Sequence, residues 1–122
     1  AHATANGKVQ LAYQTKEQLN MVLYGSNLKP YTDKTQTDLL DLQEELEGIR
    51  KKGYAITKGE LTLGIQSVAA PIFDRSGKVL AAVNVVATET TFHNEFIEKV
   101  ALPRALETSA KLSSYMGYQL KN

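Results

Sequence analysis

The strongest helical pattern in this chain is a set of apolar residues three or four positions apart: Leu39, Leu42, Leu46 and Ile49. This spacing places the four side chains on one face and predicts an amphipathic helix. Thr37 is its predicted N-cap. Basic residues 50–52 suit the negative end of the helix dipole, and Gly53 is placed to end the helix.

Two shorter helices are predicted before this one. The first covers residues 4–14, with its first residue as the N-cap and Val9 among its buried positions. The second opens with a capping-box pattern at residues 15–18, and Gly25 is placed to end it. Residues 26–36 are mostly polar and contain a proline, which is typical of a loop.

The second half of the chain changes to apolar runs rich in β-branched residues. Residues 54–57, 67–73 and 79–86 are predicted strands, and residues 74–78 (DRSGK) have the composition of a tight hairpin turn. Because so short a connection cannot make a parallel crossover, the last two strands should pair antiparallel. The last strand is almost continuously apolar, which predicts burial on both faces.

A final helix should begin at Thr90 or Thr91. Its predicted apolar residues are Phe96, Ile97, Val100, Leu106 and Leu112. Pro103 should kink or divide it near Lys99, because the ring removes one hydrogen bond and crowds the preceding turn. The predicted fold class is therefore α/β (α+β), with a mainly antiparallel sheet flanked by helices.

Composition narrows the class of protein. The chain has 122 residues, 43% of them hydrophobic and 22% charged, which allows one domain with a core. A net charge of +1 gives no electrostatic reason to bind nucleic acid or a membrane. Apolar runs fall short of the about 20 residues that span a bilayer. A cytoplasmic location is therefore expected.

Motifs for catalysis or metal binding are missing from the sequence. There is no cysteine, and the two histidines, His2 and His93, lack a metal-ligand spacing. No GxSxG, P-loop or GxGxxG motif is present. An acidic run on the amphipathic helix is predicted to be a solvated face: Asp41, Glu44, Glu45 and Glu47. We expect no enzyme activity, cofactor or metal.

Two places could contact a ligand. The first turn of the first helix, residues 4–7, leaves free N–H groups that favour an anion, although an ordinary N-cap is the commoner reading of such a turn. Asn84 lies in an apolar strand, where an amide without a partner costs on the order of 1–3 kcal/mol. A structural hydrogen bond and a ligand contact are equally open for it.

Five blocks of sequence follow one another in a recognisable order: AHATANGK at 1–8, RKKGYA at 50–55, EL at 60–61, LG at 63–64 and AAPIFD at 69–74. Together they resemble the effector-binding domain of the IclR (isocitrate lyase regulator) family of bacterial transcription factors. The resemblance implies a GAF/profilin-like sheet. It also implies that residues 1–122 are a partial effector domain, incomplete at its N-terminal side and without the winged helix-turn-helix domain. Residues 81–85 and 102–106 are similar to the subgroup that regulates aromatic-acid catabolism.

The resemblance also implies a site and partners. The implied effector pocket is lined by Thr4, Ala5, Asn6, Gly7, Thr57, Glu60, Ser67, Asn84 and Val86. Its ligand would be a small organic acid, either aromatic or a short keto acid. The chain would associate with itself as a dimer or tetramer, and DNA would be bound only through the absent N-terminal domain.

This sequence departs from the family at two places in the implied pocket. Family members often carry acidic residues where residues 57–59 read TKG. An arginine commonly follows a Gly-Leu pair in the family, whereas residues 64–66 here read GIQ. Because a lost acid and a lost base alter the charge and shape of the loop, the effector cannot be transferred from a relative.

The alternative function is a non-sensing interaction module, whose GAF-like sheet only supports dimers or tetramers. A closed pocket holding Ser67 and Asn84 would favour sensing. The same space filled by Phe73, Leu80 or Leu61 would favour the module.

Overall fold

The computed structural model describes residues 2–23, 28–90 and 94–119. Its elements in chain order are α1 (Ala5–Ala12), α2 (Lys16–Leu23), α3 (Leu39–Lys52), β1 (Ala55–Lys58), β2 (Ile65–Phe73), β3 (Val79–Thr88), α4 (Asn94–Phe96), the π-helical turn η1 (Ile97–Ala101) and α5 (Leu102–Tyr115). The predicted order of three helices, three strands and a final helix is confirmed. The predictions made for Gly25, Thr91 and His93 lie outside the described residues.

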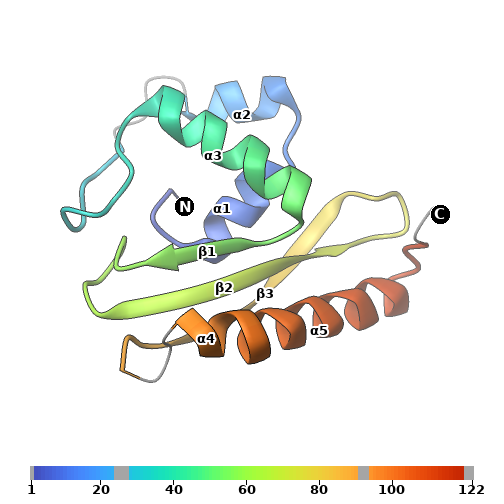
Figure 1. The fold of residues 1–122 in the computed structure, drawn as a ribbon. Helices are drawn as coiled ribbons and strands as arrows, with labels where there is room; N and C mark the ends of the chain where they lie inside the picture. Colours follow the sequence, from blue (N-terminus) through green and yellow to red (C-terminus); the bar gives the residue numbers. More distant parts are fainter. Residues whose placement is uncertain (1, 24–27, 91–93, 120–122) are drawn as a thin grey trace.

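The molecule has a three-stranded sheet between two helical layers (Figure 1). Strand order is β1-β2-β3, with α1, α2 and α3 on one side and α4 to α5 along the other. Both strand pairs are antiparallel, and the predicted hairpin runs from Ile65 opposite Thr88 to Phe73 opposite Val79. The register shifts next to Phe73, so one extra residue of β3 forms a bulge there.

Local capping signals place most helix ends. The Thr4 hydroxyl accepts a hydrogen bond from the Gly7 amide at 3.0 Å, as predicted for the N-cap of α1. Gly53 ends α3 with φ +89°, a left-handed conformation that favours glycine. The prediction for the start of α3 was wrong by one residue: Asp38, not Thr37, is the N-cap, because its carboxylate accepts from the Asp41 amide at 3.0 Å.

The central strand is β2, and the expectation that β3 is buried on both faces was wrong. Residues 66–71 of β2 are all buried, whereas Leu80 and Val86 of β3 are 57% and 54% exposed. The reason is its place in the sheet: within the described residues, β2 is the only strand that pairs with β3, which therefore lies at an edge. α1 reaches β3 at Ala82, whose carbonyl accepts from the Asn6 side chain at 3.3 Å.

Helix α5 packs against the sheet through small residues. Its buried stripe, together with the last residue of η1, is Ala101, Ala105, Ser109 and Ser113. Val100 and Leu106, predicted to belong to the apolar face, are 41% and 37% exposed. The small stripe allows close approach: the Ser109 hydroxyl donates to the Pro71 carbonyl, and the Phe73 amide donates to the Ser113 hydroxyl at 3.0 Å.

Pro103 divides the last helix, as predicted. The backbone widens into the π-helical turn η1 immediately before it, where the Leu102 amide bonds to the Ile97 carbonyl five residues back. The missing amide of Pro103 and its ring account for this break near Lys99. None of the helices in the described ranges is long and apolar enough to cross a membrane.

Candidate functional site

A cavity of about 120 Å³ lies between the start of α1, the loop after β1, and strands β2 and β3. Eight of the nine residues predicted for the binding site line it: Thr4, Ala5, Asn6, Thr57, Glu60, Ser67, Asn84 and Val86. Gly7 is the exception, because it lines a separate hollow beside Gln10 and Leu11. Residues from five different segments therefore meet at one place.

The first turn of α1 forms one wall of the cavity. The Gly7 amide donates to the Thr4 hydroxyl. The amides of Ala5 and Asn6, which also belong to this first turn, have no acceptor within the helix because of helix geometry. The Asn6 side chain is already engaged: it donates to the Ala82 carbonyl and accepts from Gln10 at 2.5 Å. This wall thus offers backbone donors at the positive end of a helix.

The strand wall presents a pair of hydroxyls. Thr57 and Ser67 are opposite each other on β1 and β2, and their hydroxyl oxygens lie 2.6 Å apart. Both residues are buried, at 5% and 8% exposed. One of the two hydroxyl protons is used between them, so the pair keeps a second proton that can be donated to a ligand.

Asn84 faces the cavity from β3 and is exposed. Its backbone pairs with Ala69, and its side chain has no hydrogen-bond partner among the described residues. Because the side chain is exposed, water can satisfy its amide, so its position requires neither the structural hydrogen bond nor the ligand contact. Neither Phe73 nor Leu80 is among the lining residues, while Leu61 contributes to the wall.

Glu60 is the charged residue of the cavity wall, and its partner was missed by sequence reasoning. Lys8 is 0% exposed, and its Nζ lies 2.5 Å from Glu60 Oε1 and 2.6 Å from Glu45 Oε1. The prediction that Glu45 belongs to a solvated face was therefore wrong. A signal was present, because Lys8 falls on the buried stripe of α1 with Ala5 and Ala12.

Two threonines that were assigned only to a loop hold the segment that carries Glu60. The Thr35 hydroxyl donates to the Glu60 carbonyl, and the Thr32 hydroxyl donates to the Gly59 carbonyl at 2.5 Å. The Thr32 amide in turn donates to the Thr35 hydroxyl at 3.0 Å. Nothing in the local sequence marks these contacts, which join positions 25 and 27 residues apart.

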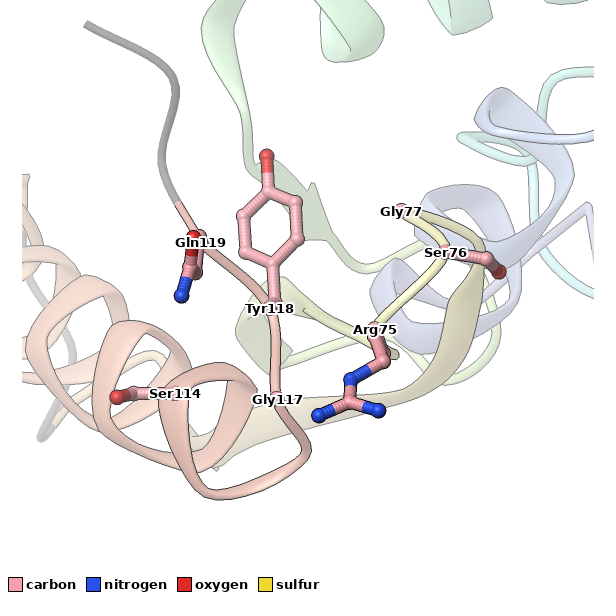
Figure 2. Close-up of a pocket in the computed structure, with 7 residues that line it drawn as sticks. All are labelled: Arg75, Ser76, Gly77, Ser114, Gly117, Tyr118 and Gln119. Atoms are coloured by element: carbon pink, nitrogen blue, oxygen red, sulfur yellow. The ribbon is translucent and has the colours of Figure 1, made fainter.

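Larger hollows lie at the opposite end of the sheet, beside the hairpin. One of about 810 Å³ is lined by the hairpin turn and the end of α5 (Figure 2). In Figure 2 the Tyr118 hydroxyl points away from Arg75, whose side chain lies along Gly117. The polar groups of this hollow do not converge on one point, so it is a weaker candidate than the smaller cavity.

An apolar groove of about 470 Å³ adjoins that hollow. Its aromatic rings pack against each other, with centroids 5.2 Å apart for Tyr13 and Phe73 and 4.8 Å apart for Phe73 and Tyr118. Burial raises the pKa of the Tyr13 hydroxyl, which Arg50 partly counteracts. We therefore interpret the groove as a region where these aromatic side chains pack against each other, and not as a ligand site.

Metal chemistry has no support in the part of the chain that the structure describes. No three His, Cys, Asp or Glu side chains gather there into a group that could hold an ion. His2 uses its Nε2 in a hydrogen bond with the Lys29 carbonyl at 2.8 Å.

Comparison with known proteins gives one consistent family. Residues 1–114 match the family described as bacterial transcriptional regulator IclR C-terminal. The HTH-type transcriptional regulator KdgR of Escherichia coli is 34% identical over 119 residues, covering 96% of this chain and 44% of the relative. The Pca operon regulatory protein of Acinetobacter baylyi is 30% identical over 116 residues, covering 95% and 42%. The chain thus spans less than half the length of these relatives.

Solved structures show the same fold. The C-terminal domain of E. coli KdgR superposes with a TM-score of 0.87 at 30% identity, covering 96% of this chain and 71% of that one. The inducer-binding domain of the PobR transcription factor from Acinetobacter, a double mutant in complex with 3-hydroxybenzoic acid, superposes with a TM-score of 0.86 at 28% identity. That superposition covers 92% of this chain and 64% of the PobR chain.

Proposed function

We propose that this chain, which belongs to the IclR family of bacterial transcriptional regulators, is a C-terminal domain that binds a small organic acid as its effector. The observation that carries the proposal is the cavity between α1 and the sheet, lined by eight of the nine residues expected for the site. The PobR inducer-binding domain, which has the same fold, is in complex with 3-hydroxybenzoic acid, and this supports a carboxylic acid as the ligand.

The carboxylate of the ligand would lie at the first turn of α1. The Ala5 and Asn6 amides would donate to it, with the helix dipole favouring the negative charge. Asn84 and the proton left on the Thr57–Ser67 pair would supply neutral hydrogen bonds to the rest of the ligand. Gly7 would have no role in binding, because its amide is used in the helix cap with Thr4 and it does not line the cavity.

The volume of the cavity favours a short acid. Pockets for larger organic ligands usually measure about 300–1,000 Å³, and an apolar cavity of about 150 Å³ holds a benzene ring. At about 120 Å³, this cavity would hold a short keto acid or similar molecule within its walls, whereas an aromatic acid would extend beyond them.

The regulatory output would come from the rest of the protein. With a charge of +1, this chain offers little attraction to DNA, so contact with DNA would be made by an N-terminal winged helix-turn-helix domain. Effector occupancy would then bias the arrangement of the DNA-binding domains in an oligomer. Non-polar side chains exposed on β3 and on the last helix support self-association as a dimer or tetramer: Leu80, Val86, Val100 and Leu106.

Calorimetric titration tests the proposal. Short keto acids and aromatic acids are titrated into the full-length protein and into its Ser67→Ala and Asn84→Ala variants. Loss of one neutral hydrogen bond should weaken binding roughly threefold to tenfold. If an acid binds and neither substitution weakens it, the site is elsewhere. If no acid binds, the non-sensing module is favoured, and light scattering then shows whether the protein still forms oligomers.

A further inference from the structure

Glu60 is held both at its side chain and at its backbone. Lys8 on α1 donates to the carboxylate at 2.5 Å, and the Thr35 hydroxyl donates to the Glu60 carbonyl. The neighbouring Gly59 carbonyl is held by Thr32 at 2.5 Å. Because these contacts come from two other parts of the chain, neither the loop nor the carboxylate can turn freely. The cavity therefore has one acidic group in a defined position.

The charges around Lys8 indicate that Glu60 acts as an acceptor. The Lys8 side chain is 0% exposed, the Glu60 side chain 12% and the Glu45 side chain 33%. A buried ammonium needs ionised partners close to it, because an unpaired charge out of water is strongly unfavourable. One ammonium between two carboxylates leaves the cluster with a formal charge of −1. An ionised carboxylate has no proton to donate.

This acceptor constrains the ligand. A ligand carboxylate is repelled by Glu60 and is drawn to the amides at the start of α1, on another wall of the same small cavity. The ligand group that faces Glu60 must then donate a hydrogen bond. A keto oxygen only accepts, so beside Glu60 neither the keto oxygen nor the carboxylate oxygen that does not bond to Lys8 would gain a hydrogen bond.

We propose that the ligand is a short carboxylic acid with a hydrogen-bond donor, a hydroxyl or an ammonium, beside its carboxylate. Lys8 is the positioning residue that aims Glu60 at this donor. The inference rests on the proposed function and narrows the ligand class, from short acids in general to those that carry a donor.

Three acids with the same carbon skeleton test this inference: alanine, lactate and pyruvate carry an ammonium, a hydroxyl and a keto oxygen at carbon 2. Each is titrated calorimetrically into the full-length protein. Alanine or lactate should bind roughly 10- to 100-fold more tightly than pyruvate, because a hydrogen bond to a charged group is worth that much. Whichever of alanine and lactate binds more tightly identifies the donor group, an ammonium or a hydroxyl.

Variants of Lys8 and its two carboxylate partners then test whether this cluster causes the preference for a donor-bearing acid. Glu60→Gln, whose amide can also donate, should reduce the preference for the donor-bearing acid over pyruvate to within about threefold. Glu45→Gln is the matched control, because Glu45 bonds to the same ammonium but does not line the cavity, and it should keep the preference. Lys8→Arg keeps the positive charge but changes its position, so the preference should fall while the circular dichroism spectrum stays unchanged.

The outcomes separate the two proposals. Pyruvate binding as tightly as lactate and alanine would overturn the inference and leave the acid-sensing function standing. An unchanged preference in Glu60→Gln would also overturn it. Absence of binding by all three acids and by the aromatic acids would overturn the proposed function itself.

Discussion

The hydroxyls of Thr57 and Ser67 face each other across β1 and β2 at 2.6 Å, in a position where neither residue is more than 8% exposed. The pair satisfies two buried polar groups at once and forms part of the cavity wall. Substitutions at this position of the sheet are therefore expected to change both the stability and the binding of the proposed ligand.

Removing both of these hydroxyls should cost less than the sum of the costs of removing each one alone. Ser67→Ala leaves the Thr57 hydroxyl buried without its partner, which should lower the free energy of unfolding by about 1–3 kcal/mol. Adding Thr57→Val removes that unpaired group, so the double variant should lose less than the sum of the single losses. Urea unfolding of the four proteins measures this cycle. Strictly additive losses would mean that the two hydroxyls do not depend on each other.

Substitutions at two helix caps should distinguish an effect on stability from an effect on ligand binding. Thr4→Ala and Thr15→Ala each remove an N-cap hydroxyl and should each destabilise the protein by about 1 kcal/mol. Only Thr4 lines the cavity, so only Thr4→Ala should weaken acid binding, by roughly threefold to tenfold. Thermal unfolding and calorimetry give the two readouts. Equal effects on affinity would argue against an anion at the start of α1.

Two glycine substitutions should change stability in opposite directions. Gly59 has φ +73°, and a Cβ there would lie 3.2 Å from the Lys34 side chain, so Gly59→Ala should cost about 1–2 kcal/mol. Gly48 lies within α3 with nothing within 4 Å of an added Cβ, so Gly48→Ala should stabilise by about 0.5–1 kcal/mol. Denaturant unfolding compares them. The same sign for both would contradict the left-handed turn at Gly59.

The contact of α5 with the sheet should not accept a larger side chain. Ala105 is 1% exposed in the small-residue stripe, so Ala105→Leu should destabilise by about 1–3 kcal/mol. Ala110→Leu, on the exposed side of the same helix, should stay within about 0.5 kcal/mol of the wild type. Thermal melts of the two variants test this. A tolerated Ala105→Leu would show that α5 can move away from β2.

The hairpin turn should weaken in acid. The Ser76 side chain is the main cause that lowers the pKa of Asp74, and the Lys78 and Ser76 amides add to it. Because the folded pKa lies below the ordinary value of 3.8, the stabilisation is present above pH 3.8 and is lost as pH falls through the folded pKa. Amide chemical shifts of residues 76 and 78 followed from pH 6 to pH 2 measure this. Asp74→Asn should abolish the transition.

Features decided within a few residues were predictable. The cap at Thr4, the hairpin turn at 74–78, the glycine end of α3 and the break before Pro103 each depend on neighbours close in sequence. The start of α3 shows the limit of such signals, since two adjacent polar residues could each cap the helix. Asp38 does so because its carboxylate reaches the free amide.

The nine candidate site residues were named from resemblance, and the fold brings eight of them to one cavity. The cluster that holds Glu60 was not found. Lys8 meets carboxylates 37 and 52 residues away in the sequence, and no local pattern marks such partners. Glu45 was assigned to solvent for the same reason.

The sequence by itself determined the type and order of the elements, most of their ends, the antiparallel hairpin and the family. Only the tertiary structure decided that β2 and not β3 is central, that α5 packs through small residues, and that Lys8 is buried between two carboxylates. The physical reason is that caps and turns depend on backbone groups a few residues away. The burial of a side chain, and the partner that makes a buried charge tolerable, depend on elements that meet only when the chain has folded.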